Sequence, residues 1–172
     1  LDLLSSGRAA DALRVPGVAI DRDALQRRGL DPTASEAMLR SSALGTLTDI
    51  KVVSEKQTED GAIVTVTYRA SGHSGTTSFD VAQDGWDGIT PAWRFTVSPL
   101  AVVNLTMNGA DEFAINGFEV NRNQVALEGV DADPTEPIPL LVFTPGVYSV
   151  TVETPIAKAS GIGVLADMPL AT

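Results

Sequence analysis

Residues 113–120 read Phe-Ala-Ile-Asn-Gly-Phe-Glu-Val and residues 144–150 read Thr-Pro-Gly-Val-Tyr-Ser-Val, and these two stretches decide the fold of the second half of the chain. Asn116-Gly117 provides two adjacent residues that tolerate positive φ, which a type I′ hairpin turn requires. Pro145-Gly146 favours a tight turn, and every second residue from Tyr148 to Val152 is apolar or aromatic. Both stretches therefore predict strands joined by tight turns.

The composition is that of a packed, folded chain. Of the 172 residues, 44% are hydrophobic, 20% are charged and 5% are aromatic. This is enough apolar material for a core built mainly from Val, Leu, Ile and Ala. Because a typical domain has about 100 to 150 residues, we expect two small domains.

Acidic residues are concentrated in the second half of the chain. The formal net charge is -10, and residues 98–172 contain two basic residues against nine acidic ones, whereas residues 1–45 contain six of each. An acidic surface repels the phosphates of nucleic acids and of anionic lipids, so both are poor partners. The simplest role of this charge is to keep the protein in solution.

Several kinds of site and segment are excluded by what the sequence lacks. The absence of cysteine excludes disulfides, thiol catalysis and cysteine-ligated zinc. No stretch approaches the roughly 20 apolar residues of a membrane helix, and the residues given show no basic-then-apolar pattern that resembles a signal peptide. The apolar residues from Leu1 to Leu13 resemble the inner side of an amphipathic helix that starts upstream, so we expect that an N-terminal membrane or lipid anchor has been removed.

Residues 1–45 predict three helices. Pro16-Gly17 separates the first from the second, and Asp21 is placed to cap the second. Asp31-Pro32 supplies an N-cap and a first-turn proline for the third, with Thr33 and Glu36 as an alternative capping box. The expected helices cover residues 1–13, 21–29 and 31–45.

From Leu47 the apolar period changes to two, which predicts four strands in an antiparallel meander. Turn residues separate the strands at Asp60-Gly61, at Ser71 to Gly75 and at Asp84 to Gly88. The residues expected to face inward are Ile50 and Val52; Val64, Val66 and Tyr68; Thr77, Phe79 and Val81; and Trp93, Phe95 and Val97. Helices followed by a meander with one apolar face predict an α+β unit whose curved sheet wraps the helices.

The order of elements in residues 1–97, with Leu3 to Leu13 as a first helix, resembles the nuclear-transport-factor-like, or cystatin-like, cone fold. It is similar in particular to the exported, membrane-anchored versions of that fold in actinobacteria. The resemblance implies a space between helices and sheet, where such folds often hold a small apolar ligand. A few are isomerases or dehydratases that use an Asp or His together with a Tyr.

Four aromatic residues on the expected inward faces are candidates to line such a pocket, with core packing as the alternative role. They are Tyr68, Phe79, Trp93 and Phe95. No inward Asp or His joins them, because Asp80 alternates outward. The catalytic residues of the enzymes therefore have no positions here to match.

Ser98-Pro99 is the expected domain boundary, because proline cannot donate to a strand ladder. Beyond it the sequence predicts strands at 103–107, 125–127, 140–143 and 148–152 and a hairpin at 113–120. With its Asn-Gly hairpin and its Pro-Gly-Val-Tyr-Ser-Val strand, this part resembles small extracytoplasmic β-sandwich modules, including PEGA-type repeats. The predicted fold is thus α+β, with N-terminal helices packed on a curved antiparallel meander in residues 1–97 and a small all-β sandwich domain in residues 98–172.

Three groups of polar residues are candidates for catalysis or metal binding, and each has a simpler role. The candidates are His73; Asp80, Asp84 and Asp87; and Asp131, Asp133 and Glu136. The histidine lies between two Ser-Gly pairs, where a solvated turn is expected. The first acidic group lacks the spacing of an EF-hand and contains an Asp-Gly hairpin signal, and the second lies in a proline-stiffened connector.

We therefore expect a non-catalytic, extracytoplasmic binding or interaction protein of a bacterial cell envelope, without cofactor, metal or catalytic residues. Envelope proteins or wall material are the expected partners, and only the upstream anchor would reach the membrane. A small-ligand carrier or small enzyme, with its pocket in residues 1–97, is the alternative. A third possibility is that residues 98–172 form an assembly surface.

Overall fold

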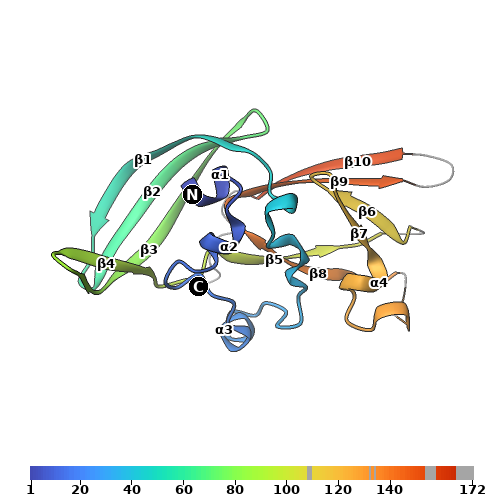
Figure 1. Ribbon diagram of the computed structural model, residues 1–172, viewed down its shortest axis with the longest axis horizontal. Coiled ribbons are helices and arrows are strands. Elements are labelled where there is room, and N and C mark those ends of the chain that lie inside the picture. The colour runs from blue at the N-terminus through green and yellow to red at the C-terminus, as the bar shows by residue number, and fades with distance from the viewer. Residues whose placement is uncertain (108–109, 132, 134, 154–157, 166–172) are drawn as a thin grey trace.

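The computed structural model describes residues 1–107, 110–131, 133, 135–153 and 158–165. Within these residues the chain forms ten strands and seven short helices, none of which exceeds six residues (Figure 1). The expected α+β fold, in which N-terminal helices pack on the meander, is therefore wrong. The protein is mostly β, and its helices are single turns or little more.

Residues 1–45 form helical turns in place of three full helices. These are α1 (Asp2–Ser5), α2 (Ala9–Ala12), α3 (Arg22–Arg27) and the 3-10 helices η1 (Glu36–Met38) and η2 (Ser41–Ala43). The first expected helix is interrupted at Gly7, whose φ is +73°. The third is wrong because Asp31 accepts a hydrogen bond from the backbone N–H of Thr33 at 2.7 Å, a local turn that competes with a helix.

The second expected helix is confirmed as α3. Asp21 caps it by accepting a hydrogen bond from the backbone N–H of Ala24 at 2.9 Å. At its other end the Arg28 guanidinium donates to the carbonyls of Ser98 and Leu100, both at 3.3 Å. The helix is thereby fixed to a segment seventy residues further along the chain.

The four-stranded meander is confirmed. It consists of β1 (Leu47–Gln57), β2 (Gly61–Ala70), β3 (His73–Asp87) and β4 (Thr90–Phe95), paired in that order. The turn expected at Asp84 to Gly88 lies further out, because β3 continues through a bulge. Gln83 pairs with Trp93 and Trp86 with Pro91, so β3 has one more residue than β4 over this interval, and Gly85 has a φ of +80°.

The second half contains a ribbon of two strands and a sheet of four. β5 (Leu100–Leu105) pairs with β8 (Ile138–Phe143), and the four-stranded sheet has the order β10 (Lys158–Leu165), β9 (Gly146–Glu153), β6 (Glu112–Ile115) and β7 (Phe118–Asn121). The Asn-Gly hairpin is confirmed as β6–β7. Asn116 and Gly117 have φ values of +52° and +83° between the paired residues Ile115 and Phe118.

Two elements of the second half differ from the prediction. The strand expected at 125–127 is wrong, because the Asn121 side chain accepts from the backbone N–H of Asn123 and caps the helix α4 (Arg122–Val125), which η3 (Gly129–Asp131) follows. The strand β10 has no counterpart in the prediction. Two glycines interrupt the alternation of its sequence, Lys-Ala-Ser-Gly-Ile-Gly-Val-Leu.

The core is shared between residues on both sides of Ser98. The largest cluster joins Met38 and Ala43 to Phe113, Leu140 and Tyr148; a second joins Leu25 and Leu39 to Leu100, Leu141 and Phe143; and a third joins Leu47, Tyr68 and Ala70 to Val147. Residues 1–45 therefore pack on β5, β8 and β9 as well as on the meander. The expected boundary lies between β4 and β5, and the division into two domains stays a prediction.

The Asn116 side chain holds together three segments that are distant in the sequence. Its Nδ2 donates to the carbonyls of Ala43 at 2.8 Å and Val147 at 2.7 Å. Its Oδ1 accepts from the backbone N–H of Ser149 at 2.9 Å. The hairpin turn is thus fixed to η2 and to β9 by one amide group.

We predict that Asn116→Asp lowers the free energy of unfolding by about 2 kcal/mol or more at neutral pH. A carboxylate cannot donate to the carbonyl oxygens of Ala43 and Val147, to which the amide donates now, and it would be repelled by them. The loss of stability should be smaller in acid, where the protonated carboxyl can donate a hydrogen bond to one of the two carbonyls. Urea denaturation at several pH values measures this.

The matched control is Asn121→Asp, at the α4 cap, where a carboxylate accepts as well as an amide. It should change stability by no more than about 0.5 kcal/mol. Equal effects of the two variants would contradict the role assigned to Asn116.

Tyr148 closes the corner where the chain passes from β8 to β9. Its hydroxyl accepts from the backbone N–H of Phe143 at 2.9 Å and donates to the carbonyl of the same residue at 3.3 Å. The ring belongs to the largest core cluster and is packed against by Val150 and Val152, as the alternation predicts. Pro145-Gly146 therefore stands at a corner between two sheets, which Tyr148 fixes from inside.

We predict that Tyr148→Phe lowers the free energy of unfolding by about 1–3 kcal/mol, because the Phe143 N–H stays buried without an acceptor. Burial raises the pKa of Tyr148. The neutral hydroxyl is therefore favoured in the folded state, and this stability is full below the unfolded pKa of about 10 and lost as the pH rises above it. Alkaline urea titrations should show a smaller loss in the variant, and equal losses would contradict the assignment.

Candidate functional site: an apolar cavity beside the meander

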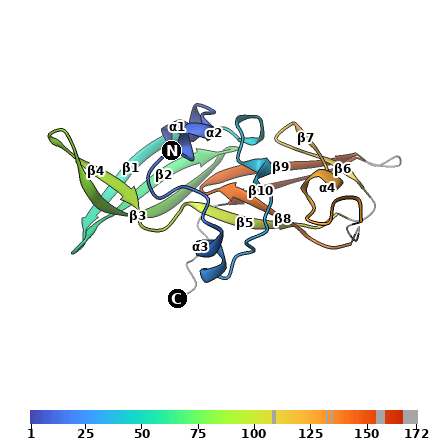
Figure 2. The same ribbon diagram turned by 60° about the horizontal axis from the view of Figure 1, so that its bottom comes forward.

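A cavity of about 230 Å³ lies between the N-terminal turns and the meander. α1 and α2 lie against one face of the meander in both views (Figure 1 and Figure 2). Of the fifteen lining residues, only Asp2 and Thr144 have polar side chains. The others are Leu1, Leu3, Leu4, Ala12, Val15, Val18, Ile50, Val52, Val66, Phe79, Phe95, Pro99 and Phe143.

Two of the predicted pocket residues meet in this cavity. Phe79 of β3 and Phe95 of β4 pack edge to face, with ring centroids 5.4 Å apart and an angle of 83° between their planes. Both line the cavity and both are partly buried. Such an edge-to-face pair presents a fixed, apolar wall to whatever enters.

The other two predicted pocket residues lie elsewhere. Tyr68 is 1% exposed and belongs to the core cluster of Leu47, Ala70 and Val147. Trp93 is 41% exposed and lies on β4, further toward the β3–β4 turn. Neither lines the cavity.

The wall formed by β4 is fixed to the N-terminal segment at one close approach. The backbone N–H of Phe95 donates to the carbonyl of Pro16 at 2.9 Å. Gly17 follows with a φ of +84°, and a Cβ at this position would lie 2.1 Å from the carbonyl oxygen of Phe95. Only glycine fits this approach.

The chemistry of the cavity is that of apolar binding. The Thr144 hydroxyl already donates to the carbonyl of Pro99 at 2.9 Å, and Asp2 is exposed. Valine, leucine and phenylalanine side chains exclude water and favour a hydrocarbon group by roughly 25 cal/mol per Å² of apolar surface buried. The arrangement suits a small apolar ligand or an inserted apolar side chain.

The polar candidates are dispersed, and all of them except Asp80 are exposed. His73 is exposed, and its Nδ1 lies 3.1 Å from the carbonyl oxygen of Ser71. Asp84 and Asp87 are exposed, and Asp80 is half-buried. Among the described residues, no group of three or more His, Asp or Glu side chains is placed to hold a metal ion.

The acidic loop after α4 is organised around a cation of the protein itself. Arg122 is 2% exposed, and its Nη2 donates to the carbonyls of Asp133 and, at 2.8 Å, of Glu136. Hydrogen bonds from the hydroxyl and the backbone N–H of Thr135 lower the pKa of Asp133. Two carbonyl groups of this loop thus face a guanidinium, and the carboxylates of Asp131, Asp133 and Glu136 belong to exposed residues.

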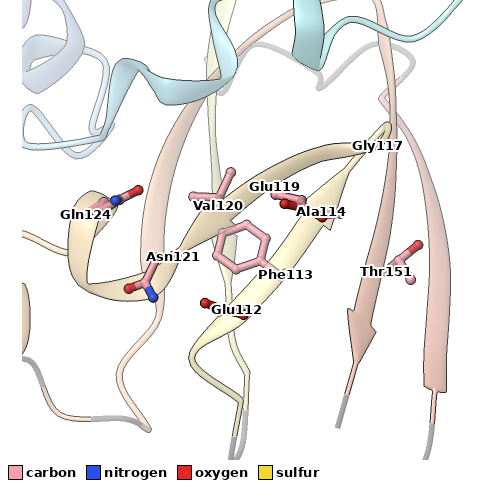
Figure 3. A pocket seen from close by; sticks show the side chains of 9 residues that line it. All are labelled: Glu112, Phe113, Ala114, Gly117, Glu119, Val120, Asn121, Gln124 and Thr151. Carbon is pink, nitrogen blue, oxygen red and sulfur yellow. The ribbon is translucent and has the colours of Figure 1, made fainter.

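A larger hollow, of about 540 Å³, lies beside the β6–β7 hairpin (Figure 3). Its side chains come from β6, β7, α4 and β9 and include the carboxylates of Glu112 and Glu119. Both glutamates are exposed, so water competes fully for any polar group there. Its volume exceeds that of the apolar cavity, but its more polar lining offers a ligand less free energy of burial.

Sequence reasoning did not assign the walls contributed by Leu3, Leu4 and Val15 to a pocket. The apolar spacing of these residues was the available signal, but it predicted one continuous helix packed on the sheet of the meander. The structure instead breaks that helix at Gly7 and leaves a space beneath the two turns.

The sequence matches no family model, no curated protein and no solved structure. The resemblances to the cone fold and to PEGA-type modules therefore stay predictions. Within the described residues, no helix has the length and apolarity needed to span a membrane.

We predict that Gly17→Ala loosens the wall of the cavity, because the new Cβ would overlap the Phe95 carbonyl. Amide hydrogen exchange at Phe95, whose N–H is bonded to Pro16, should accelerate about tenfold or more, as its local opening becomes easier. Gly29→Ala is the control, because Gly29 also has a positive φ, +71°, but has no atom within 4 Å of the new Cβ. Equal exchange at Phe95 in the two variants would contradict the prediction.

Proposed function

We propose that the protein is a non-catalytic binding protein that takes a small apolar ligand, or an apolar group of a larger partner, in the cavity beside the meander. The observation that carries this proposal is the lining, in which thirteen of fifteen side chains are apolar. This proposal unites the expected binding role with the pocket expected in residues 1–97.

Three features of the cavity support binding. The Phe79–Phe95 pair provides an aromatic wall, and Val66, which also lines the cavity, is 5% exposed and belongs to β2. Val52 stands at the other side with 57% of its surface exposed, so the cavity opens toward solvent there. A ligand would therefore cover apolar surface that is now in water.

We propose binding without chemistry because the two polar side chains are poorly suited to catalysis. Asp2 is exposed to water, and Thr144 already donates its hydroxyl proton to Pro99. A general base or nucleophile acts when it is positioned and its pKa is tuned by burial or by a charged neighbour. The lining offers a hydrocarbon surface for recognition instead.

We also propose an extracytoplasmic location in a bacterial cell envelope, with envelope proteins or wall material as partners. This rests on the two resemblances and on the acidic, cysteine-free composition. Fractionation of the native cells, followed by immunoblotting, tests it. Recovery of the protein in the cytosolic fraction would contradict it.

The cavity is tested with the neutral apolar dye N-phenylnaphthylamine, whose fluorescence rises in apolar surroundings. We predict saturable binding to the unaltered protein. Val52→Asp should weaken it at least roughly tenfold, because the new carboxylate would be desolvated by the bound dye.

Val53→Asp is the matched control. Val53 is the adjacent residue of β1, is 55% exposed and does not line the cavity. It should leave dye binding within about twofold, since an exposed charge at that position keeps its hydration. Dye binding that is absent, or that both substitutions weaken equally, would refute the cavity as the binding site.

A further inference from the structure

The apolar wall of the cavity continues along the meander beyond the part that α1 and α2 cover. Residues that pair directly across an antiparallel ladder point to the same face, so the register places Trp93 and Pro91 on the face of Phe95. Trp86 pairs with Pro91 and joins this face. We call the line from Phe79 through Phe95 and Trp93 to Trp86 the inner stripe.

The bulge in β3 is what adds Trp86 to the inner stripe. In a regular strand, the face that carries Phe79, Val81 and Gln83 would next carry residue 85, and Trp86 would point away. The extra residue beside Gly85 shifts the alternation by one. As a result, Trp86 is 67% exposed at the outer end of the stripe, where the β3–β4 hairpin projects from the rest of the molecule (Figure 1).

The four basic residues of the meander all lie on one of its faces. Lys51 pairs with Thr67, Lys56 with Ile63, Arg69 with Thr48 and Arg94 with Ala82, which places all four basic residues of the meander on the outer face. On the inner face, Glu55 pairs with Val64 and is exposed. Asp2 stands beside the same face at the cavity.

We propose that the inner stripe binds an extended segment of a partner protein that carries apolar side chains together with Lys or Arg. The stripe runs along eight residues of β3, from Phe79 to Trp86, which is roughly 23 Å at about 3.3 Å per residue. This length suits an extended peptide better than a compact ligand. The carboxylates of Glu55 and Asp2, which lie beside the stripe on the same side of the meander, attract a cationic segment and repel a fatty acid.

The two exposed indoles add affinity for the same partner. Trp is the best acceptor for cation–π contacts with Lys and Arg, and large aromatic residues dominate the binding energy of many interfaces. The inference rests on the proposed function, because one apolar side chain of the partner would occupy the cavity beside Phe79 and Phe95.

The test uses a fluorescein-labelled peptide of alternating leucine and lysine, about eight residues long to match the stripe. Fluorescence anisotropy with the full chain should show saturable binding. A peptide in which glutamate replaces lysine should not bind measurably. Vesicles of phosphatidylcholine, presented in place of the peptide, should not bind either.

Trp86→Ala should weaken peptide binding about tenfold, as expected for an exposed aromatic anchor, and Glu55→Gln should weaken it about threefold. Asp80→Asn is the matched control for charge, because Asp80 pairs with Ile63 and lies on the outer face. It should leave the affinity within about twofold, since it removes no charge from the stripe. Unchanged melting temperatures confirm that the variants are folded.

The outcomes separate this inference from the proposed function. If Val52→Asp abolishes dye binding but the unaltered protein binds no peptide, the cavity stands as the binding site and the inference that the stripe binds a peptide is overturned. Peptide binding that is unchanged by Trp86→Ala, or is weakened equally by Glu55→Gln and Asp80→Asn, also overturns it. Preferential binding of vesicles would overturn it in favour of a lipid surface.

Discussion

The hydrogen bonds of the Asn116 side chain are the constraint on which the arrangement of the sheets depends. They join the turn of β6–β7 to the carbonyl of Ala43 and to both neighbours of Tyr148 in β9. Alternate residues of β9 serve two cores, because Tyr148 packs in the cluster with Phe113 whereas Val147 packs with Leu47 and Tyr68. A slip of β9 by one residue would exchange them and expose both cores. By bonding to Val147 and Ser149, Asn116 fixes the register that both clusters require.

The parts of the fold that the sequence predicts are those whose determinants lie within a few residues. Asn116-Gly117 needs only its two φ values to form the turn, and Asp21 reaches the N–H of Ala24 within its own helix. The meander follows in the same way, because alternation and turn residues are local signals. The Asn116 amide illustrates the limit of this reasoning. Its turn was predictable, but its bonds to Ala43 and Val147 depend on segments brought together by the completed fold.

The elements that were wrongly predicted are those in which a local hydrogen bond or a distant contact outweighs periodicity. Asp31 and Thr33 form a turn where a helix was expected, and Asn121 caps α4 where a strand was expected. The candidate site shows the same division. Alternation placed Phe79, Phe95, Tyr68 and Trp93 on one face of the sheet. It could not show that only Phe79 and Phe95 line the cavity. Which of them is buried depends on what covers the face, and Val147, which covers Tyr68, lies about eighty residues away.

The cavity and the stripe follow from one mismatch of lengths. β3 has fifteen residues and extends roughly 50 Å, whereas α1 and α2 have four residues each, or about 6 Å per helix. Two such turns, separated by Gly7, cover only one end of the inner face. A continuous helix from Leu1 to Leu13, as the apolar spacing predicted, would cover much more of that face. The apolar residues that remain, from Val52 to Trp86, lie on the face that carries none of the four basic residues of the meander, and Val52, Trp93 and Trp86 are exposed. The interruption at Gly7 therefore leaves apolar surface on this face that α1 and α2 do not cover.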